Sequence, residues 1–316
     1  MNTIDLQIQS TVSDGKHSPQ ELVKMARDQG LGVISLTDHD AVDGIDEALR
    51  RGEELGIRVI PGIEMSAEEH GIHILGYGIN YRDAALLREL EKAKLSRIEG
   101  AKKMVDNLRV NEGLIVEWED VLRESVQSST ITRPHIVAAV MKRVENRDKL
   151  ERDSVYSKRD FFEKYLSDKD PNFVKRACIS AADAIQLLHN AGGVAIWSHP
   201  PIPDFTNGGY EELEIFLKEL IKWGIDGLEV FSASHTEDDV EFLEALAMKY
   251  KLLRTAGSDF HEKGNHPADS ETGLHSARTP GDYETYGFPT GDIVEKLDEA
   301  ISKKKSAGNV SPAPND

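Results

Sequence analysis

Apolar positions follow two different periods along this chain. Short apolar runs such as VISL (33–36) and VAIW (194–197) are typical of buried strands, whereas segments with apolar residues three and four apart predict amphipathic helices. These helices are expected at about 17–30, 44–55, 83–109, 210–223 and 237–250. Because strand and helix patterns alternate with short links, they predict an α/β fold with a mainly parallel sheet, either a barrel or a doubly wound sheet.

The alternation stops between about residues 100 and 176. This segment is highly charged, and its apolar residues are at helical spacing in WEDVLRESV, IVAAVMKRV and FFEKYL. We therefore predict a helical insertion over 100–176 within an α/β domain formed by 1–99 and 177–305. The last residues, 306–316, lack apolar periodicity and are expected to form a disordered tail.

Composition and charge narrow the class of protein. The formal net charge of −18 disfavours a stable complex with nucleic acid, which needs a basic surface. The sequence has no run of 18 apolar residues to span a membrane, and its N-terminus lacks the pattern of a secretory signal. The single Cys178 excludes an internal disulfide and fits a reducing cytosol, so we expect a cytoplasmic protein. The oligomeric state stays open.

Polar side chains recur where the predicted strands end. In parallel α/β folds the carboxyl ends of the strands form one face, so these side chains are expected to lie together. Histidine and carboxylate side chains on one face are a ligand set for Zn²⁺, Mn²⁺ or Fe²⁺. The sequence therefore predicts a metal site. The strand-end residues are Asp38, His39, Glu64, His199, Glu229, Asp259 and His261, and His73 lies on the polar side of its own predicted strand.

Nucleophilic catalysis by a side chain is disfavoured. The chain has no G-x-S-x-G motif, and Cys178 precedes a predicted helix with no histidine nearby in the sequence. The stretch DLQIQS (5–10) poses a separate question, because Gln7 and Gln9 share one face of the first predicted strand. Taken alone, the two amides indicate an exposed polar face.

Eight short motifs, in order along nearly the whole chain, resemble those of the PHP (polymerase and histidinol phosphatase) superfamily. The resemblance implies a distorted (β/α)7 barrel whose mouth is covered by a helical insertion. Within the superfamily, the chain is most similar to the bacterial nucleoside 3′,5′-bisphosphate phosphatases and related 5′-to-3′ exoribonucleases. The motifs are SDG (13–15), TDHD (37–40), GIE (62–64), HILGY (73–77), RPH (133–135), SHP (198–200), EVF (229–231) and GSDFH (257–261).

The resemblance implies three neighbouring metal positions. These would hold two or three divalent ions per chain, with Mn²⁺ expected first and Zn²⁺ or Fe²⁺ as alternatives. The resemblance assigns Asp14, His39 and His261 to one position, Glu64, His73 and His199 to another, and Glu64 with Asp259 to a first position that residues 7 and 9 complete.

The first metal position is altered in this chain. The superfamily motif D-L-H-x-H-S reads Asp5-Leu6-Gln7-Ile8-Gln9-Ser10, so that both histidines are glutamines. An amide oxygen is a weaker ligand than imidazole for borderline metals. We therefore expect this position to be empty or weakly filled by Mg²⁺ or Mn²⁺.

The activity that the resemblance implies is hydrolysis of a small phosphorylated substrate by a metal-activated water. The substrate would be a nucleotide, such as a 3′,5′-bisphosphate, or the 5′ end of an oligonucleotide. Arg97 and Arg133 correspond to phosphate-binding positions, although Gly100 stands where the branch usually has another arginine. His135 is a candidate for binding the substrate or donating a proton, and Asp38 is a second catalytic candidate.

Two other functions remain open at this stage. The glutamine pair also fits a catalytically impaired homologue that binds a nucleotide or metal without efficient turnover. A phosphate ester without a nucleotide, such as histidinol phosphate, is a third possibility. The charged insertion favours a larger polyanionic substrate over such a small phosphate ester.

Overall fold

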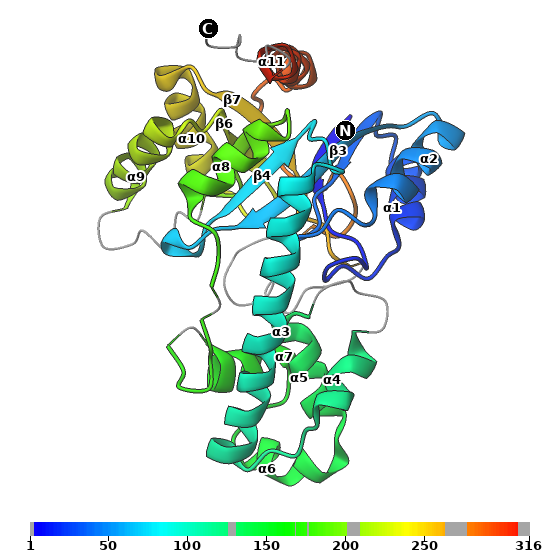
Figure 1. Cartoon of the computed structure of the whole chain (residues 1–316), viewed down its shortest axis with the longest axis vertical. Coiled ribbons are helices and arrows are strands. Elements are labelled where there is room, and N and C mark those ends of the chain that lie inside the picture. Colours follow the sequence, from blue (N-terminus) through cyan, green and yellow to red (C-terminus); the bar gives the residue numbers. More distant parts are fainter. Residues whose placement is uncertain are drawn as a thin grey trace, which may run out of the picture.

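The computed structural model of the chain describes residues 3–125, 131–167, 169–175, 177–200, 209–262 and 277–308. Two parts are visible in Figure 1: strands surrounded by helices, and below them a group of helices around the lower half of α3. No helix in the described ranges is both long and apolar enough to cross a membrane.

Seven strands lie in chain order in one sheet. They are β1 (Ile4–Ile8), β2 (Val33–Leu36), β3 (Arg58–Ser66), β4 (His73–Tyr77), β5 (Val194–Trp197), β6 (Gly227–Ser232) and β7 (Leu253–Gly257). Ile8 pairs in parallel with Phe260, just after β7, so the sheet nearly closes on itself. β4 is antiparallel to both neighbours, whereas the other adjacent strands are parallel. The expected distorted barrel is confirmed.

The helices around the barrel agree with the apolar pattern. They are α1 (Pro19–Asp28), α2 (Ile45–Leu55), α8 (Ala181–Asn190), α9 (Tyr210–Trp223), α10 (Glu237–Tyr250) and α11 (Ile293–Gly308). Ser18 caps α1, and the expected capping box with Glu21 is present. The prediction of a disordered tail from 306 is wrong for residues 306–308, which complete the last turn of α11. The remaining tail residues, 309–316, lie outside the described residues.

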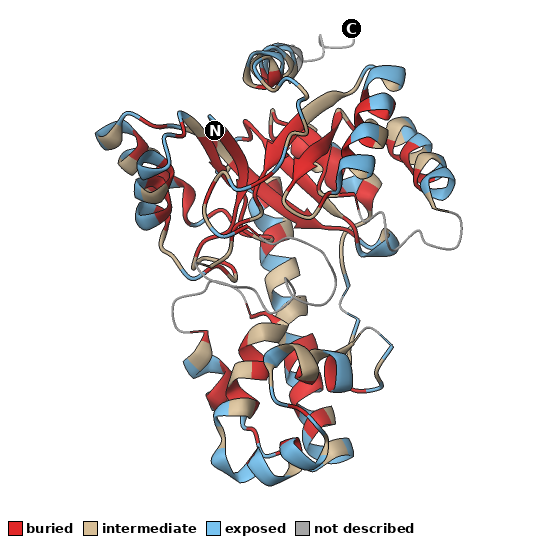
Figure 2. Ribbon diagram, turned by 180° about the vertical axis from the view of Figure 1, so that it is seen from behind, coloured by how far each residue is buried: buried red, intermediate tan, exposed pale blue. Residues whose placement is uncertain are grey.

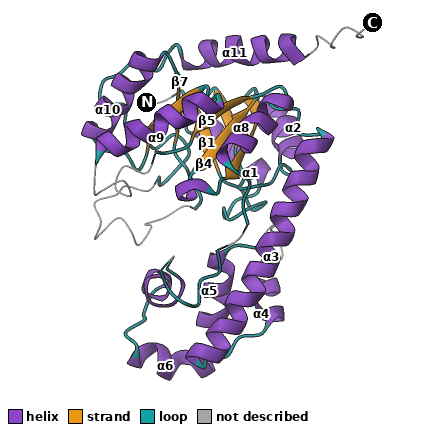
Figure 3. Ribbon diagram, turned by 60° about the vertical axis from the view of Figure 1, so that its left-hand side comes forward, coloured by secondary structure: helices purple, strands orange, loops and turns teal. Residues whose placement is uncertain are grey.

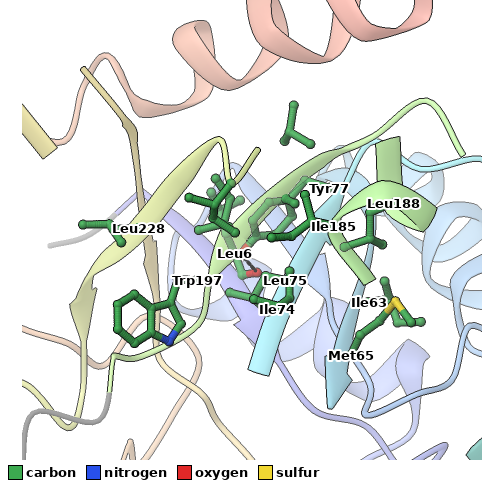
Figure 4. Close-up of a cluster of buried hydrophobic side chains, with 14 of the residues drawn as sticks. Leu6, Ile63, Met65, Ile74, Leu75, Tyr77, Ile185, Leu188, Trp197 and Leu228 are labelled. Carbon is green, nitrogen blue, oxygen red and sulfur yellow. Dashed lines mark hydrogen bonds between the residues drawn. The ribbon is translucent and has the colours of Figure 1, made fainter. Parts of the chain in front are cut away.

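The strands are mostly buried beneath these helices (Figure 2, red), and most of their apolar residues belong to the hydrophobic core. In the cluster drawn in Figure 4, Tyr77 of β4 donates its hydroxyl to the backbone oxygen of Leu6 in β1, which ties two strands together. The other face of β1 is not exposed, contrary to its reading as a polar surface. Gln7 and Gln9 are both fully buried. Fully buried amides need hydrogen-bond partners within the protein, so their role is internal.

The predicted insertion is helical and has a hydrophobic cluster of its own. Its elements are the lower part of α3 (Ala84–Glu112), α4 (Trp118–Glu124), α5 (Arg133–Lys142), a 3₁₀ turn (Val144–Asn146), α6 (Arg147–Arg152), α7 (Lys158–Phe161) and a π-helical turn (Phe162–Leu166). The buried members of this cluster run from Ala101 to Leu166. α3 continues unbroken through position 100, so one long helix joins the barrel to the insertion (Figure 3).

Candidate metal centre and cleft

Glu64 of β3 is the centre of a cluster of histidines. Its carboxylate is fully buried, and Oε1 lies 2.9 Å from Nδ1 of His73 and 3.2 Å from Nε2 of His199. Its other oxygen, Oε2, lies 3.4 Å from Nδ1 of His39. Three imidazoles from β4 and from the ends of β2 and β5 therefore converge on one carboxylate.

A second group shares His39 with the first. Nε2 of His261 lies 3.5 Å from Oδ1 of Asp14, and one ligand atom from each of Asp14, His39 and His261 lies within 4.8 Å of the others. The same limit holds for His39, Glu64 and His73. The two groups are consequently one continuous centre. They contain the residues expected at two of the three metal positions, and His199 joins them through Glu64.

The loop that carries Asp14 is held by Asp38. The Asp38 carboxylate accepts hydrogen bonds from the backbone and hydroxyl groups of Ser10 and Ser13, at 2.6 to 3.2 Å. Gly15 completes this turn, and a Cβ there would collide with the backbone oxygen of Gln9. Since Asp38 is buried and committed to these donors, its surroundings favour a positioning role over the catalytic role expected from the sequence.

The electrostatics of the centre favour positive charge. Burial by itself would raise the pKa of Glu64, but His39 and His73 hold it well below its usual value. Burial would lower the pKa of His199, but the hydrogen bond and charge of Glu64 raise it to about 10. Burial opposes charge on His261 as well, yet Asp259 and Asp14 raise its pKa to about 9. Without a metal, His199 and His261 are protonated at neutral pH and offset part of the negative charge of the carboxylates.

Divalent metals fit most of this donor set. Buried atoms without a hydrogen-bond partner in the described chain include Nδ1 of His39 and Oδ1 of Asp14, two of the expected ligands. A ligand set that combines one carboxylate with several imidazoles is suited to Zn²⁺, Mn²⁺ or Fe²⁺. The first position fits poorly. There, Nε2 of Gln9 lies 2.5 Å from Oε2 of Glu64, so an N–H group occupies the direction a cation would need.

A cavity of about 320 Å³ opens between this centre and the insertion. Its barrel side includes Asp14, His39 and His73, and its insertion side combines two arginines with apolar side chains. The insertion-side residues are Arg97, Gly100, Ala101, Met104, Ile131, Thr132, Arg133, Pro134, Phe162, Phe173 and Val174. A cavity with metal ligands on one wall and guanidinium groups on the other is suited to a phosphorylated molecule.

The two predicted arginines differ in their surroundings. Arg97 of α3 donates to Oδ2 of Asp40, from Nη2 at 2.5 Å and from Nε at 3.2 Å. Arg133, the first residue of α5, donates to the backbone oxygen of Leu166 at 3.2 Å, and its guanidinium lies over the rings of Phe162 and Phe173. These aromatic contacts help to hold the guanidinium at the cavity wall.

His135 caps the helix that Arg133 begins. Nδ1 of His135 accepts the backbone N–H of Thr132 at 3.1 Å, so a neutral ring carries its hydrogen on Nε2. Burial, together with the charge of Lys16, lowers the pKa of His135, which keeps the ring neutral at pH 7. The ring is thus suited to donating a hydrogen bond, more than to supplying a proton.

Two positioning residues were missed by sequence reasoning. Asp40 orients Arg97 and also accepts the backbone N–H of Ser66 at 2.9 Å. Ser198 donates its hydroxyl to Oε1 of Glu64 at 2.9 Å. Both belong to motifs noted in the sequence, TDHD and SHP, and this membership could have identified them as site residues. Their partners are 57 and 134 residues away, which no local pattern reveals.

The barrel, the buried carboxylate and the converging histidines define a metal-dependent hydrolase. Residues 5–168 match the PHP domain family. The chain belongs to this family and is one of its metal-dependent phosphoester hydrolases, as the motifs predicted.

Relatives with named activities are similar over most of their length. A 5′-3′ exoribonuclease of Haemophilus influenzae is 32% identical over 81% of this chain and 89% of its own. A 3′,5′-nucleoside bisphosphate phosphatase of Chromobacterium violaceum is 30% identical over 84% and 89%. Among solved structures, a Bifidobacterium adolescentis protein assigned to the metal-dependent phosphoesterases has a TM-score of 0.74 and 27% identity, covering 94% of this chain and 96% of that one.

Proposed function

We propose that the chain hydrolyses a nucleotide, such as a nucleoside 3′,5′-bisphosphate, or the 5′ end of an oligonucleotide. The observation that carries this proposal is the cavity itself. It joins the Glu64 centre to Arg97 and Arg133 and offers apolar surface beside them. A phosphate would face the metal ligands and the arginines, and the organic part of the substrate would face the apolar wall. Two relatives with this substrate class support the same choice.

The proposed ligands fall into two groups around Glu64. One group is Asp14, His39 and His261, and the other is Glu64, His73 and His199, with Asp259 beside them. We propose Mn²⁺ first, with Zn²⁺ or Fe²⁺ as alternatives, because the set mixes imidazole with carboxylate oxygen. When bound, such ions neutralise the phosphoryl oxygens and lower the pKa of water.

The side chains of the insertion orient the substrate. Arg133 presents a planar fork that grips two phosphoryl oxygens, and its aromatic neighbours restrict the directions it can take. Arg97 is paired with Asp40, whose carboxylate offsets part of its charge. His135 donates a hydrogen bond from Nε2 to a substrate oxygen. The negative charge of the whole chain, −18, agrees with a small substrate that leaves and disfavours a stable nucleic-acid complex.

The test is a comparison of phosphoesters with the metal-free protein and added Mn²⁺. Phosphate release from a nucleoside bisphosphate or nucleotide release from a short oligonucleotide is expected to rise with Mn²⁺. Glu64→Gln should abolish it, while Glu68→Gln, at an exposed position four residues along, should not change it. Hydrolysis of non-nucleotide phosphomonoesters alone would contradict the proposed substrate.

One observation favours a second candidate, a homologue that binds nucleotide and metal with little turnover. Gln7 and Gln9 stand where the family motif has histidines, and both are buried beside Glu64. Nucleotide binding without any metal-dependent rate would support this candidate. A rate that follows Mn²⁺ saturation would exclude it.

A further inference from the structure

We propose that amide hydrogen bonds from Gln7 and Gln9 replace the first metal of the family in this chain. They hold Glu64 in place for a centre of about two ions instead of three. This inference rests on the proposed ligand set at Glu64, and it goes further by assigning a role to the two glutamines. Gln9 and Gln7 are thus positioning residues, which act on the chemistry through Glu64.

Gln9 contacts Glu64 directly. Its Nε2 donates to Oε2 of Glu64 at 2.5 Å. Its Oε1 lies 3.2 Å from the Ser13 hydroxyl, whose one hydrogen is closer to Asp38, at 2.6 Å. A carboxylate only accepts hydrogen bonds, so the amide must present its NH₂ group toward Glu64. The Gln9 oxygen therefore faces Ser13 and points away from Glu64.

Gln7 acts on the same carboxylate through Ser198. The hydroxyl of Ser198 donates its only hydrogen to Oε1 of Glu64 at 2.9 Å, so its oxygen is left to accept from Nε2 of Gln7, also at 2.9 Å. Oε2 of Glu64 thus receives a hydrogen bond from Gln9, which follows β1, and Oε1 receives one from Ser198, which in turn accepts from Gln7 of β1. The carboxylate is fixed from the side where the family has its first metal.

The orientation of these amides disfavours a cation more than the weak ligand strength of an amide oxygen does. A metal at this position needs oxygen lone pairs, whereas the structure presents N–H groups, and an amide would have to rotate and give up its bond toward Glu64. The strand that carries Gln7 lies close against β7. A Cβ at Gly257 would overlap both the Gln7 side chain and the Glu229 carboxylate. Oε1 of Gln7 is the one amide atom here without a partner in the described chain.

The first experiment counts metal ions in the absence of substrate. Metal-free protein is saturated with Mn²⁺ and its content measured by plasma mass spectrometry, with circular dichroism as a check on folding. The natural chain should hold about two ions, and the double variant Gln7→His, Gln9→His should hold about one more. Three ions in the natural chain, or no additional ion in a folded double variant, would overturn the proposal.

The second experiment tests positioning with Gln9→Met, which keeps the length of the side chain and removes its donor. The affinity for Mn²⁺ at the remaining positions, measured by calorimetry, should fall by roughly 10-fold or more, as for loss of other partners behind a ligand. Gln20→Met, at an exposed position on α1, is the matched control and should bind as the natural chain does. Unchanged affinity in a folded Gln9→Met protein would refute the positioning role.

These outcomes are separable from those of the proposed function. Failure to cleave any nucleotide, with about two ions bound, would overturn the proposed substrate and leave the role of the glutamines intact. A third tightly bound ion, with normal nucleotide cleavage, would overturn the role of the glutamines and leave the proposed substrate intact.

Discussion

Replacing Arg133 by alanine probes the link between the insertion and the barrel. The guanidinium lines the cavity opposite the metal ligands, and packing on Phe162 and Phe173, at 5.6 and 5.0 Å, holds it there. Loss of a hydrogen-bonded charge pair with a phosphate removes about 1–3 kcal/mol. Since 1.36 kcal/mol is a factor of ten, kcat/KM of Arg133→Ala should fall by roughly 5- to 150-fold.

The assay has to separate substrate binding from folding, because Arg133 also donates to the backbone oxygen of Leu166. Initial rates of nucleotide hydrolysis at saturating Mn²⁺ give KM and kcat, and urea unfolding gives the stability of each variant. Arg133→Lys keeps the charge and loses the planar fork, so its kcat/KM should lie between those of the natural chain and Arg133→Ala. Arg147→Ala, at an exposed position of α6, should match the natural chain. Unchanged KM and kcat in folded Arg133→Ala would refute the phosphate-binding role.

Three further predictions concern the charges around the centre. Asp40→Asn leaves the largely buried Arg97 without its charge partner and should lower the free energy of unfolding by roughly 3 kcal/mol, measured with urea; an unchanged value would mean that the pair contributes little. Binding of Mn²⁺ at pH 7 should release about two protons, because His199 and His261 have pKa values of about 10 and 9 and must be neutral to bind a metal. Calorimetry in buffers of different ionisation enthalpy measures this release. For the same reason the contribution of these two histidines to the stability of the metal-free protein is complete below the ordinary histidine pKa of 6.5. It should be lost as the pH rises toward 10, which thermal melts above pH 7 check and which saturating Mn²⁺ should remove.

The alternation of strands and helices and the gathering of polar residues at the strand ends could be predicted from the sequence. Alternating strand and helix patterns predicted the barrel helices because apolar periodicity is a local property of the chain. The residues after β2 and β7, such as His39 and His261, were expected together because strands that pair in parallel end at one face. The structure brings them into one group with Asp14, within 4.8 Å. The motif order was also sufficient to predict the PHP family, which the similarity over residues 5–168 confirms.

The contacts of the glutamines and arginines could not be predicted from the sequence, because they depend on the three-dimensional fold. Gln7 and Gln9 looked like an exposed strand face, yet closing the barrel buries both of them beside Glu64. Arg97 looked available for phosphate, yet the end of β2 supplies Asp40 as its partner. The partners in these hydrogen bonds are separated by 55 and 57 residues, and the bond from Gln7 to Ser198 spans 191. A local pattern gives the type of side chain and the face it lies on, whereas the direction of a buried amide or guanidinium depends on acceptors from distant strands.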